Sequence, residues 1–172
     1  MSQQNRAEIW LNKALELENR GRDYYLAASQ KAAEKIISDF FQNMADMELQ
    51  HIEAIKNIYA KLGNASCWLE KHNGPHGTQT VNKIFLDMSK HKPKPEDGIV
   101  EVIEKCLAFE VEAEAFYKNE IPNAECSDEK DFLTAMAAEE RDHQNILTDM
   151  KLYYTDPESW AEKMDNGHLD GV

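Results

Sequence analysis

The chain has 172 residues, which is long enough for one domain with a buried core, and we predict a single domain over residues 1–172. Glycine and proline are scarce, and long stretches carry the helix-forming residues Ala, Leu, Glu, Lys and Met, so the composition predicts an all-α protein. The formal net charge of −13 repels nucleic-acid phosphates and anionic membrane surfaces. We therefore expect neither as a partner.

The first residues lack the apolar core of a signal peptide, and no apolar run is long enough to span a membrane, so we expect a cytoplasmic protein. Cys67, Cys106 and Cys126 form no Cys-x-x-Cys pair. Their number and spacing argue against a zinc ribbon, a rubredoxin-type iron centre and structural disulfides. We expect all three as buried thiols.

Apolar residues at helical spacing predict a first helix from about Ala7 to Lys31. Gly21 lies inside it and costs about 1 kcal/mol relative to Ala, but it would allow the close approach of a neighbour or ligand. A second helix is predicted from Ser38, as its N-cap, to the stop signal at residues 62–64. The two helices form a hairpin over about residues 7–63.

A second hairpin is predicted over about residues 97–155. Its first helix runs from about Asp97 to Glu120 and is terminated by Pro122, and its second helix starts after Ser127, which we interpret as the N-cap. Between the hairpins lies a crossover of residues 65–96, with a short helix near residues 81–88. Such a link is needed when the second and third helices of a bundle run parallel.

After the second hairpin, Asp156 is predicted to cap a short fifth helix that has Pro157 at its first position, with the segment 156–172 ending in a tail. The predicted fold is therefore an all-α four-helix bundle with a long central crossover and a short C-terminal fifth helix. His72 and His76 lie in the crossover, and we interpret them as ordinary polar loop residues, with adventitious metal binding as the alternative.

Two Glu-x-x-His motifs occur in the chain, and each follows a lone Glu that lies 30 residues upstream. A single shift of 92 residues relates the two sets and also superimposes Tyr25 on Tyr117. Residues three apart share one face of a helix, so each motif directs a carboxylate and an imidazole to one point. The pattern predicts a dinuclear iron or manganese site with four carboxylates and two histidines. The predicted metal ligands are Glu18, Glu48, His51, Glu110, Glu140 and His143.

With these motifs the chain resembles the rubrerythrin branch of the ferritin-like superfamily over about residues 7–154, without an attached rubredoxin domain. The resemblance implies two iron ions that are bridged by Glu48 and Glu140. By the same analogy, the terminal ligands are Glu18 and Glu110, and His51 and His143 bind one ion each. The alternative is a set of exposed charges with two surface histidines.

Tyr25 and Tyr117 each follow a predicted terminal Glu by seven residues and so return to nearly the same helix face. We expect them to lie over Glu18 and Glu110 and to hydrogen-bond the ligand carboxylates. The alternative is two ordinary core tyrosines.

The resemblance implies an oxidoreductase that reduces hydrogen peroxide or dioxygen in oxidative-stress defence, with electrons from a separate donor such as a rubredoxin-like protein. One departure concerns Ala113, because peroxide-reducing members of the branch carry a seventh ligand-type Glu at that position. Glu112 and Glu114 are interpreted as solvated charges, with an inward Glu114 as the alternative.

Two rival functions stay open, an iron-oxidising or iron-storage protein and a non-catalytic, metal-stabilised interaction module. We also expect a homodimer whose contact is organised by residues 65–96. Each hairpin supplies only half of the ligands, and the long crossover would allow the two hairpins to be exchanged between subunits.

Overall fold

The computed structural model describes residues 3–61, 78–90, 92–94 and 97–165. Over this part of the chain it contains α-helices and one short 3₁₀-helix but no strand, which confirms the all-α prediction. The elements are α1 (Gln3–Lys31), α2 (Lys35–Lys61), α3 (Thr78–Met88), α4 (Ile99–Glu120), η1 (Ile121–Asn123), α5 (Ser127–Thr155) and α6 (Pro157–Asp165). The predictions for residues 62–64, Cys67, His72, His76 and the tail after residue 165 lie outside the described residues.

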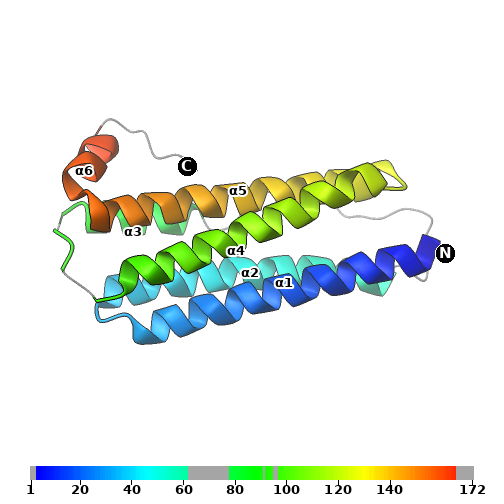
Figure 1. Cartoon of the computed structure of the whole chain (residues 1–172), viewed down its shortest axis with the longest axis horizontal. Helices are drawn as coiled ribbons and strands as arrows, with labels where there is room; N and C mark the ends of the chain where they lie inside the picture. The colour runs from blue at the N-terminus through cyan, green and yellow to red at the C-terminus, as the bar shows by residue number, and fades with distance from the viewer. Residues whose placement is uncertain (1–2, 62–77, 91, 95–96, 166–172) are drawn as a thin grey trace.

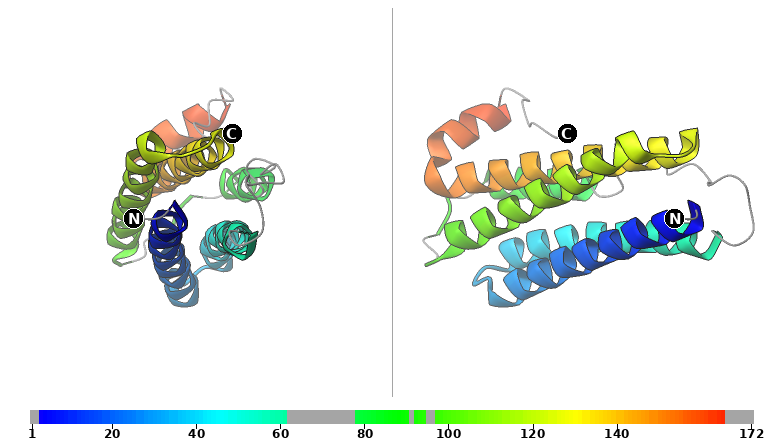
Figure 2. Two further views of the ribbon diagram at one scale, coloured as in Figure 1. Left: turned by 90° about the vertical axis from the view of Figure 1, so that its right-hand side faces the viewer. Right: turned by 45° about the vertical axis from the view of Figure 1, so that its right-hand side comes forward.

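The four long helices form a bundle of two antiparallel hairpins, α1 with α2 and α4 with α5 (Figure 1). Helices α2 and α4 run in the same direction, so the chain must return along the length of the bundle between them (Figure 2). Helix α3 belongs to this connection and lies beside the bundle. The predicted crossover and its short helix are therefore confirmed, although the helix begins a little earlier than predicted.

Helix α2 begins earlier than the sequence pattern suggested, because the turn between α1 and α2 is only three residues long. The backbone N–H of Ser38 donates to the carbonyl of Glu34 at 3.0 Å, so Ser38 already lies in the first turn. Its carbonyl accepts a hydrogen bond from the Ser29 hydroxyl at 2.9 Å. Ser38 is therefore not the N-cap, and it ties the end of α1 to the start of α2 instead.

The starts of α4 and α5 also differ from prediction. Gly98 adopts φ 79° immediately before α4, a left-handed conformation that favours glycine, so the helix starts at Ile99 and not at Asp97. Helix α5 starts at Ser127 itself, with the extended Cys126 as N-cap and without a side-chain capping bond. Cys126 is only half-buried, so the buried-thiol prediction is wrong there and holds for Cys106.

Two apolar clusters fill the bundle, one toward each end, and the predicted metal ligands lie between them along all four long helices. One cluster contains Trp10 of α1, whose ring lies 6.2 Å from that of Phe132 of α5. The other contains Phe85 of α3, whose ring centroid lies 5.9 Å from Phe40 of α2 and 6.1 Å from Trp160 of α6. Helices α3 and α6 therefore pack together against one end of the bundle.

Helix α6 is fixed to the bundle by polar as well as apolar contacts. Asp156 Oδ1 accepts the backbone N–H of Ser159 at 3.1 Å, which confirms Asp156 as its cap. The Lys163 ammonium lies 2.6 Å from Asp149 Oδ1, and the Asp149 side chain is 2% exposed. Among the described helices, none has the length and apolar character that crossing a membrane requires.

Candidate metal centre

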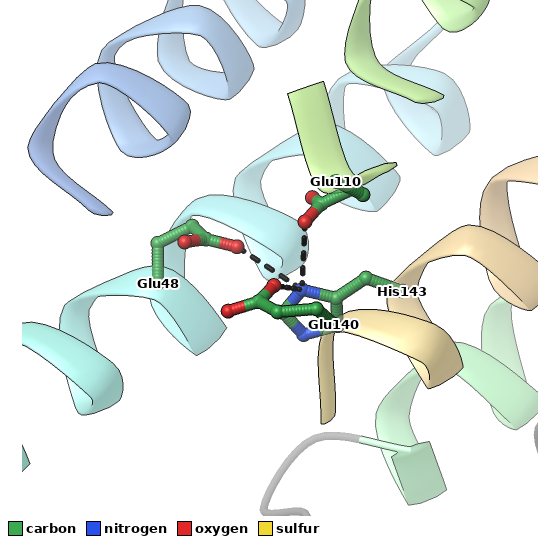
Figure 3. A group of neighbouring side chains, drawn as sticks. All are labelled: Glu48, Glu110, Glu140 and His143. Atoms are coloured by element: carbon green, nitrogen blue, oxygen red, sulfur yellow. Dashed lines mark ion pairs between the residues drawn. The ribbon is translucent and has the colours of Figure 1, made fainter. Parts of the chain in front are cut away.

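The structure brings all six predicted metal ligands together in the middle of the bundle, and each is at most 2% exposed. Their ligand atoms form two groups, within each of which the atoms lie within 4.8 Å of one another. One group is Glu48, Glu110, Glu140 and His143 (Figure 3). The other is Glu18, Glu48 and His51. Because Glu48 belongs to both groups, the two groups share a carboxylate.

Two carboxylates each face both imidazoles. Glu140 Oε1 lies 3.4 Å from His51 Nδ1, and Glu140 Oε2 lies 3.3 Å from His143 Nδ1. Glu48 Oε1 lies 3.1 Å from His143 Nδ1, and Glu48 Oε2 lies 4.0 Å from His51 Nδ1. A carboxylate that directs one oxygen to each of two nitrogen ligands has the geometry that a bridging ligand needs.

The other two carboxylates each face one imidazole. Glu18 Oε2 lies 3.0 Å from His51 Nδ1, and Glu110 Oε2 lies 3.6 Å from His143 Nδ1. The two imidazole rings stack with their centroids 5.3 Å apart and their planes at 14°. The cluster thus has an approximate two-fold arrangement, as the 92-residue repeat suggests, with one terminal carboxylate and one imidazole on each side.

The donor set fits a pair of divalent metal ions. Four buried ligand atoms have no hydrogen-bond partner: Glu48 Oε1, both carboxylate oxygens of Glu140, and His143 Nδ1. Buried acceptors of this kind are costly unless a cation or a proton compensates them. Carboxylate oxygen and imidazole nitrogen are ligands that iron(II) and manganese(II) accept, so these residues are suited to hold either metal.

The electrostatics of the metal-free cluster favour proton uptake. Burial, together with the neighbouring carboxylates Glu110, Glu18 and Glu140, raises the pKa of Glu48 well above its usual value. Burial also raises the pKa of Glu110 to about 7, even though His143 opposes the shift. Metal binding must therefore compete with protons near neutral pH.

The pKa values of the two histidines are also raised, but for a different reason. Burial alone would lower the pKa of His51, but the charges of Glu18 and Glu140 outweigh burial and raise it. His143 behaves alike, with Glu110 as the largest opposing charge. Without metal, the imidazoles partly neutralise the carboxylates by holding protons.

Tyr25 and Tyr117 do hydrogen-bond predicted ligand carboxylates, but each bonds the carboxylate of the other hairpin. The Tyr25 hydroxyl donates to Glu110, and the Tyr117 hydroxyl donates to Glu18. The expected hydrogen bonds to ligand carboxylates are therefore present, and each of them joins the two hairpins. Burial raises the pKa of both hydroxyls, so both remain donors at neutral pH.

Glu114 is neither a solvated charge nor an inward ligand. Its carboxylate is 6% exposed and accepts two hydrogen bonds from Arg141 of α5, at 2.9 and 2.7 Å. Burial opposes its ionisation, but hydrogen bonds from Lys118, Arg141 and Gln144 outweigh burial and lower the pKa of Glu114 to about 2. It therefore links α4 to α5 at the edge of the site. Glu112 is exposed, as predicted, and pairs with Arg20 at 2.6 Å.

Gly21 permits a close approach to the site, as its position inside α1 suggested. A Cβ atom there would lie 3.0 Å from Phe109 Cε1 and 3.3 Å from Glu48 Oε2. The centroid of the Phe109 ring lies 6.4 Å from that of the Tyr24 ring and 4.5 Å from the Arg20 guanidinium carbon. The missing side chain of Gly21 thus leaves room for Phe109 and for the candidate ligand Glu48.

Sequence reasoning missed Glu139, which is 9% exposed and directs Oε2 to His51 Nε2 at 2.9 Å. The only signal in the sequence is that it directly precedes Glu140. Because successive helical residues point about 100° apart, that adjacency does not identify a partner on another helix.

The helical arrangement and the buried carboxylate and histidine cluster define the ferritin-like class of bundles. Residues 10–91 match the family model Rubrerythrin, and this match confirms the resemblance to the rubrerythrin branch over α1, α2 and the crossover. The second hairpin lies outside the matched residues and is connected to the first by the internal repeat. No curated protein and no solved structure gave a significant match.

Proposed function

We propose that this chain is a non-haem dinuclear iron protein that reduces hydrogen peroxide or dioxygen. The observation that carries the proposal is the pair Glu48 and Glu140, each of which directs an oxygen to both imidazoles inside a buried cluster. When bound, two iron(II) ions would supply the two electrons that, with two protons, convert one hydrogen peroxide into two water molecules. Manganese suits the same donors.

The protein's own residues would perform three tasks. The four carboxylates hold charge at fixed positions, and Tyr25 and Tyr117 orient the two terminal ones through their hydroxyl groups. The apolar clusters on both sides exclude water from the site. Glu110, with its pKa raised to about 7 before metal binds, is a group that can hold a proton near neutral pH.

The electrons must be replaced after each turnover. Within this proposal they come from a separate one-electron donor, such as a rubredoxin-like protein. The setting we propose is cytoplasmic defence against oxidative stress, which suits an oxidant-consuming reaction.

A single-turnover experiment tests the activity. Anaerobic protein loaded with iron(II) is mixed with hydrogen peroxide, and iron oxidation is followed by stopped-flow absorption. We expect one peroxide to be consumed for every two iron(II) ions. If the iron remains reduced while its content is confirmed as intact, the redox proposal fails, and a non-catalytic, metal-stabilised module becomes the better interpretation.

The role of Ala113 sharpens this test. This side chain is 3% exposed on α4 and supplies no carboxylate at the position of the seventh ligand in peroxide-reducing relatives. We therefore expect A113E to speed the reaction with peroxide when metal content is preserved. The control is A115E, which places the same carboxylate on an exposed position of α4. An equal rate in the wild type and A113E would make the missing ligand irrelevant.

A second candidate function is iron oxidation followed by release or storage, and Ala113 favours it because the seventh ligand is absent. It predicts that one chain oxidises many more than two iron(II) ions when iron is supplied in excess. A storage shell would also give a large multi-subunit mass in size-exclusion chromatography. If the protein reduces peroxide and keeps all of its iron, this second function is excluded.

A homodimer organised by residues 65–96 remains part of the proposal. One chain already brings all six predicted ligands together, so exchange of hairpins is not needed to complete a site. Mixing a chain that carries E48A and H51A with one that carries E140A and H143A tests exchange, because only exchange rebuilds an intact site. A monomeric mass in solution would exclude the dimer.

A further inference from the structure

The two histidines of the cluster differ in the residue that lies near the ring nitrogen Nε2, the nitrogen that does not face the cluster. His51 directs Nδ1 to the carboxylate of Glu18 at 3.0 Å and Nε2 to the carboxylate of Glu139 at 2.9 Å. Glu139 lies on α5, in the opposite hairpin, and accepts a hydrogen bond when it is ionised. An acceptor at Nε2 fixes the ring proton there and leaves the Nδ1 lone pair directed into the cluster.

The internal repeat breaks at this position. The 92-residue shift places Met47 where the second hairpin has Glu139. Met47 is 5% exposed on α2, and its thioether is only a weak acceptor. The first hairpin therefore cannot offer His143 the carboxylate that the second hairpin offers His51. In other respects the two histidines have like surroundings, since each Nδ1 faces Glu48, Glu140 and one terminal carboxylate.

We propose that Glu139 makes the metal position at His51 the tighter of the two, so that the cluster fills in a fixed order, His51 side first. Glu139 acts as a positioning residue, because it would not bind the ion but would orient the ring and strengthen its donor nitrogen. A hydrogen-bonded carboxylate behind a ligand histidine typically changes metal affinity by about 10 to 100-fold. The inference rests on the metal binding that we proposed above.

One observation favours the opposite order, and it is the compactness of the donor groups. The group that contains His143 has four residues, whereas the group that contains His51 has three. Carboxylate side chains can rotate toward an ion as it binds, so a looser group can tighten. No rotation, however, can give Met47 a carboxylate. We therefore expect the lasting chemical difference to decide the order.

Titration of the metal-free protein with cobalt(II), followed by visible absorption and calorimetry, tests the order. We expect two ions to bind with dissociation constants at least about 10-fold apart. H51A should lose the tighter step, and H143A should lose the weaker one. The ligand-field spectrum of the first ion should change in E139M, which a purely structural role for Glu139 would not produce.

The repeat supplies matched variants. E139M gives His51 the surroundings that His143 has, so the gap between the two dissociation constants should close by about 10-fold or more. M47E offers His143 a carboxylate and should close the gap by strengthening the second step. E139Q keeps an acceptor without the charge and should restore part of the gap. The control is E16M, which changes an exposed residue of α1 and should leave both steps unaltered.

The outcomes separate this inference from the proposed function. If no cobalt binds, both fail. If two ions bind with equal affinity in the wild type, or if E139M is folded and keeps the full gap, the metal site stands and the role of Glu139 is wrong. Loss of the weaker step in H51A would reverse the order and also overturn it.

Discussion

The two hairpins of this bundle carry the same ligand pattern but surround it differently. Each offers two carboxylates and one imidazole, while two of the neighbouring positions that the repeat superimposes have diverged. Glu139 corresponds to Met47, and Ala113 corresponds to Gly21. The repeat therefore preserves the six candidate ligands and the two tyrosines that hydrogen-bond them, whereas it varies the positions of Glu139 and Ala113. Equal ligands need not make equal metal positions, because the outer residues orient the ligands and limit access to them.

The largest effect should come from the carboxylates that join the two halves. Glu140→Ala combined with Glu48→Ala removes both candidate bridges, so we expect no iron(II) to be retained after desalting, as measured by elemental analysis. Glu18→Ala and Glu110→Ala each remove a ligand from one half only, so each should retain one ion. Retention of two ions by the double variant would disprove the assignment.

Removing the metal should expose the repulsion among the buried carboxylates that the two hairpins contribute. Glu48 and Glu110 have raised pKa values in the folded protein, so their stabilising contribution is present when they are protonated and is lost as pH rises through those values. For Glu110 this loss lies between about pH 4.5 and about pH 7. The raised pKa values of the histidines act in the same direction at higher pH. Glu140, whose pKa is lowered, acts in the opposite direction, and its contribution is lost only below about pH 4.5.

We therefore expect the melting temperature of the metal-free protein to fall between pH 5.5 and pH 8.5, by about 2 to 4 °C for each kcal/mol lost. The iron(II)-loaded protein should melt higher, since metal that binds only the native state stabilises it by mass action. Its advantage should widen as pH rises. Circular dichroism melts under anaerobic conditions measure both effects, and a metal-free protein that gains stability over this range would contradict the argument.

Substituting the two tyrosines should have a smaller effect and allows the two halves of the site to be compared. Tyr25→Phe and Tyr117→Phe each remove one buried hydrogen bond to a carboxylate of the opposite hairpin, which should cost about 1 to 3 kcal/mol. Similar losses would show that the approximate two-fold arrangement extends to the tyrosines. Urea denaturation of the metal-free variants measures them, and Tyr24→Phe, an exposed neighbour, is the control. A loss below about 0.5 kcal/mol at both positions would mean that these bonds contribute little.

The smallest effect should come from exchanging small residues between the halves. Ala113→Gly should destabilise α4 by about 1 kcal/mol through helix propensity alone. Gly21→Ala should not give back the same amount, because its Cβ would meet Phe109 at 3.0 Å and force that side chain to shift. Thermal denaturation of both variants tests this inequality, and equal and opposite changes would show that Phe109 yields without cost.

The sequence indicated the helices and the six candidate ligands because both depend on spacing within single helices. A three-residue separation fixes the relation of Glu48 to His51, and the repeat extends that relation to Glu140 and His143. The partners of Tyr25 and Glu139 were not predictable in this way. They depend on how far one helix is rotated and shifted against another, and local patterns carry no record of either quantity.

Charged residues outside the cluster illustrate the same limit. Glu114 was predicted to be a surface charge, because the sequence around it does not indicate a contact with Arg141 on the next long helix. The predicted starts of α2 and α5 were wrong for a more local reason. Ser38 and Ser127 are good capping residues, but at both places the short preceding turn already lets the backbone enter the helix before, or at, the serine.

The beginning of α1 and helix α6 lie at opposite ends of the bundle, and each contacts α5 there (Figure 1). In α1 the Trp10 indole donates to the buried Glu129 carboxylate at 2.9 Å, whereas in α6 the Lys163 ammonium lies 2.6 Å from the buried Asp149 carboxylate. Helix α5 supplies both carboxylates and so is held at each end by a different terminus. In native-state hydrogen exchange, its two ends should therefore open independently, each at the rate at which its own terminal helix detaches, while the amides around Glu140 exchange last.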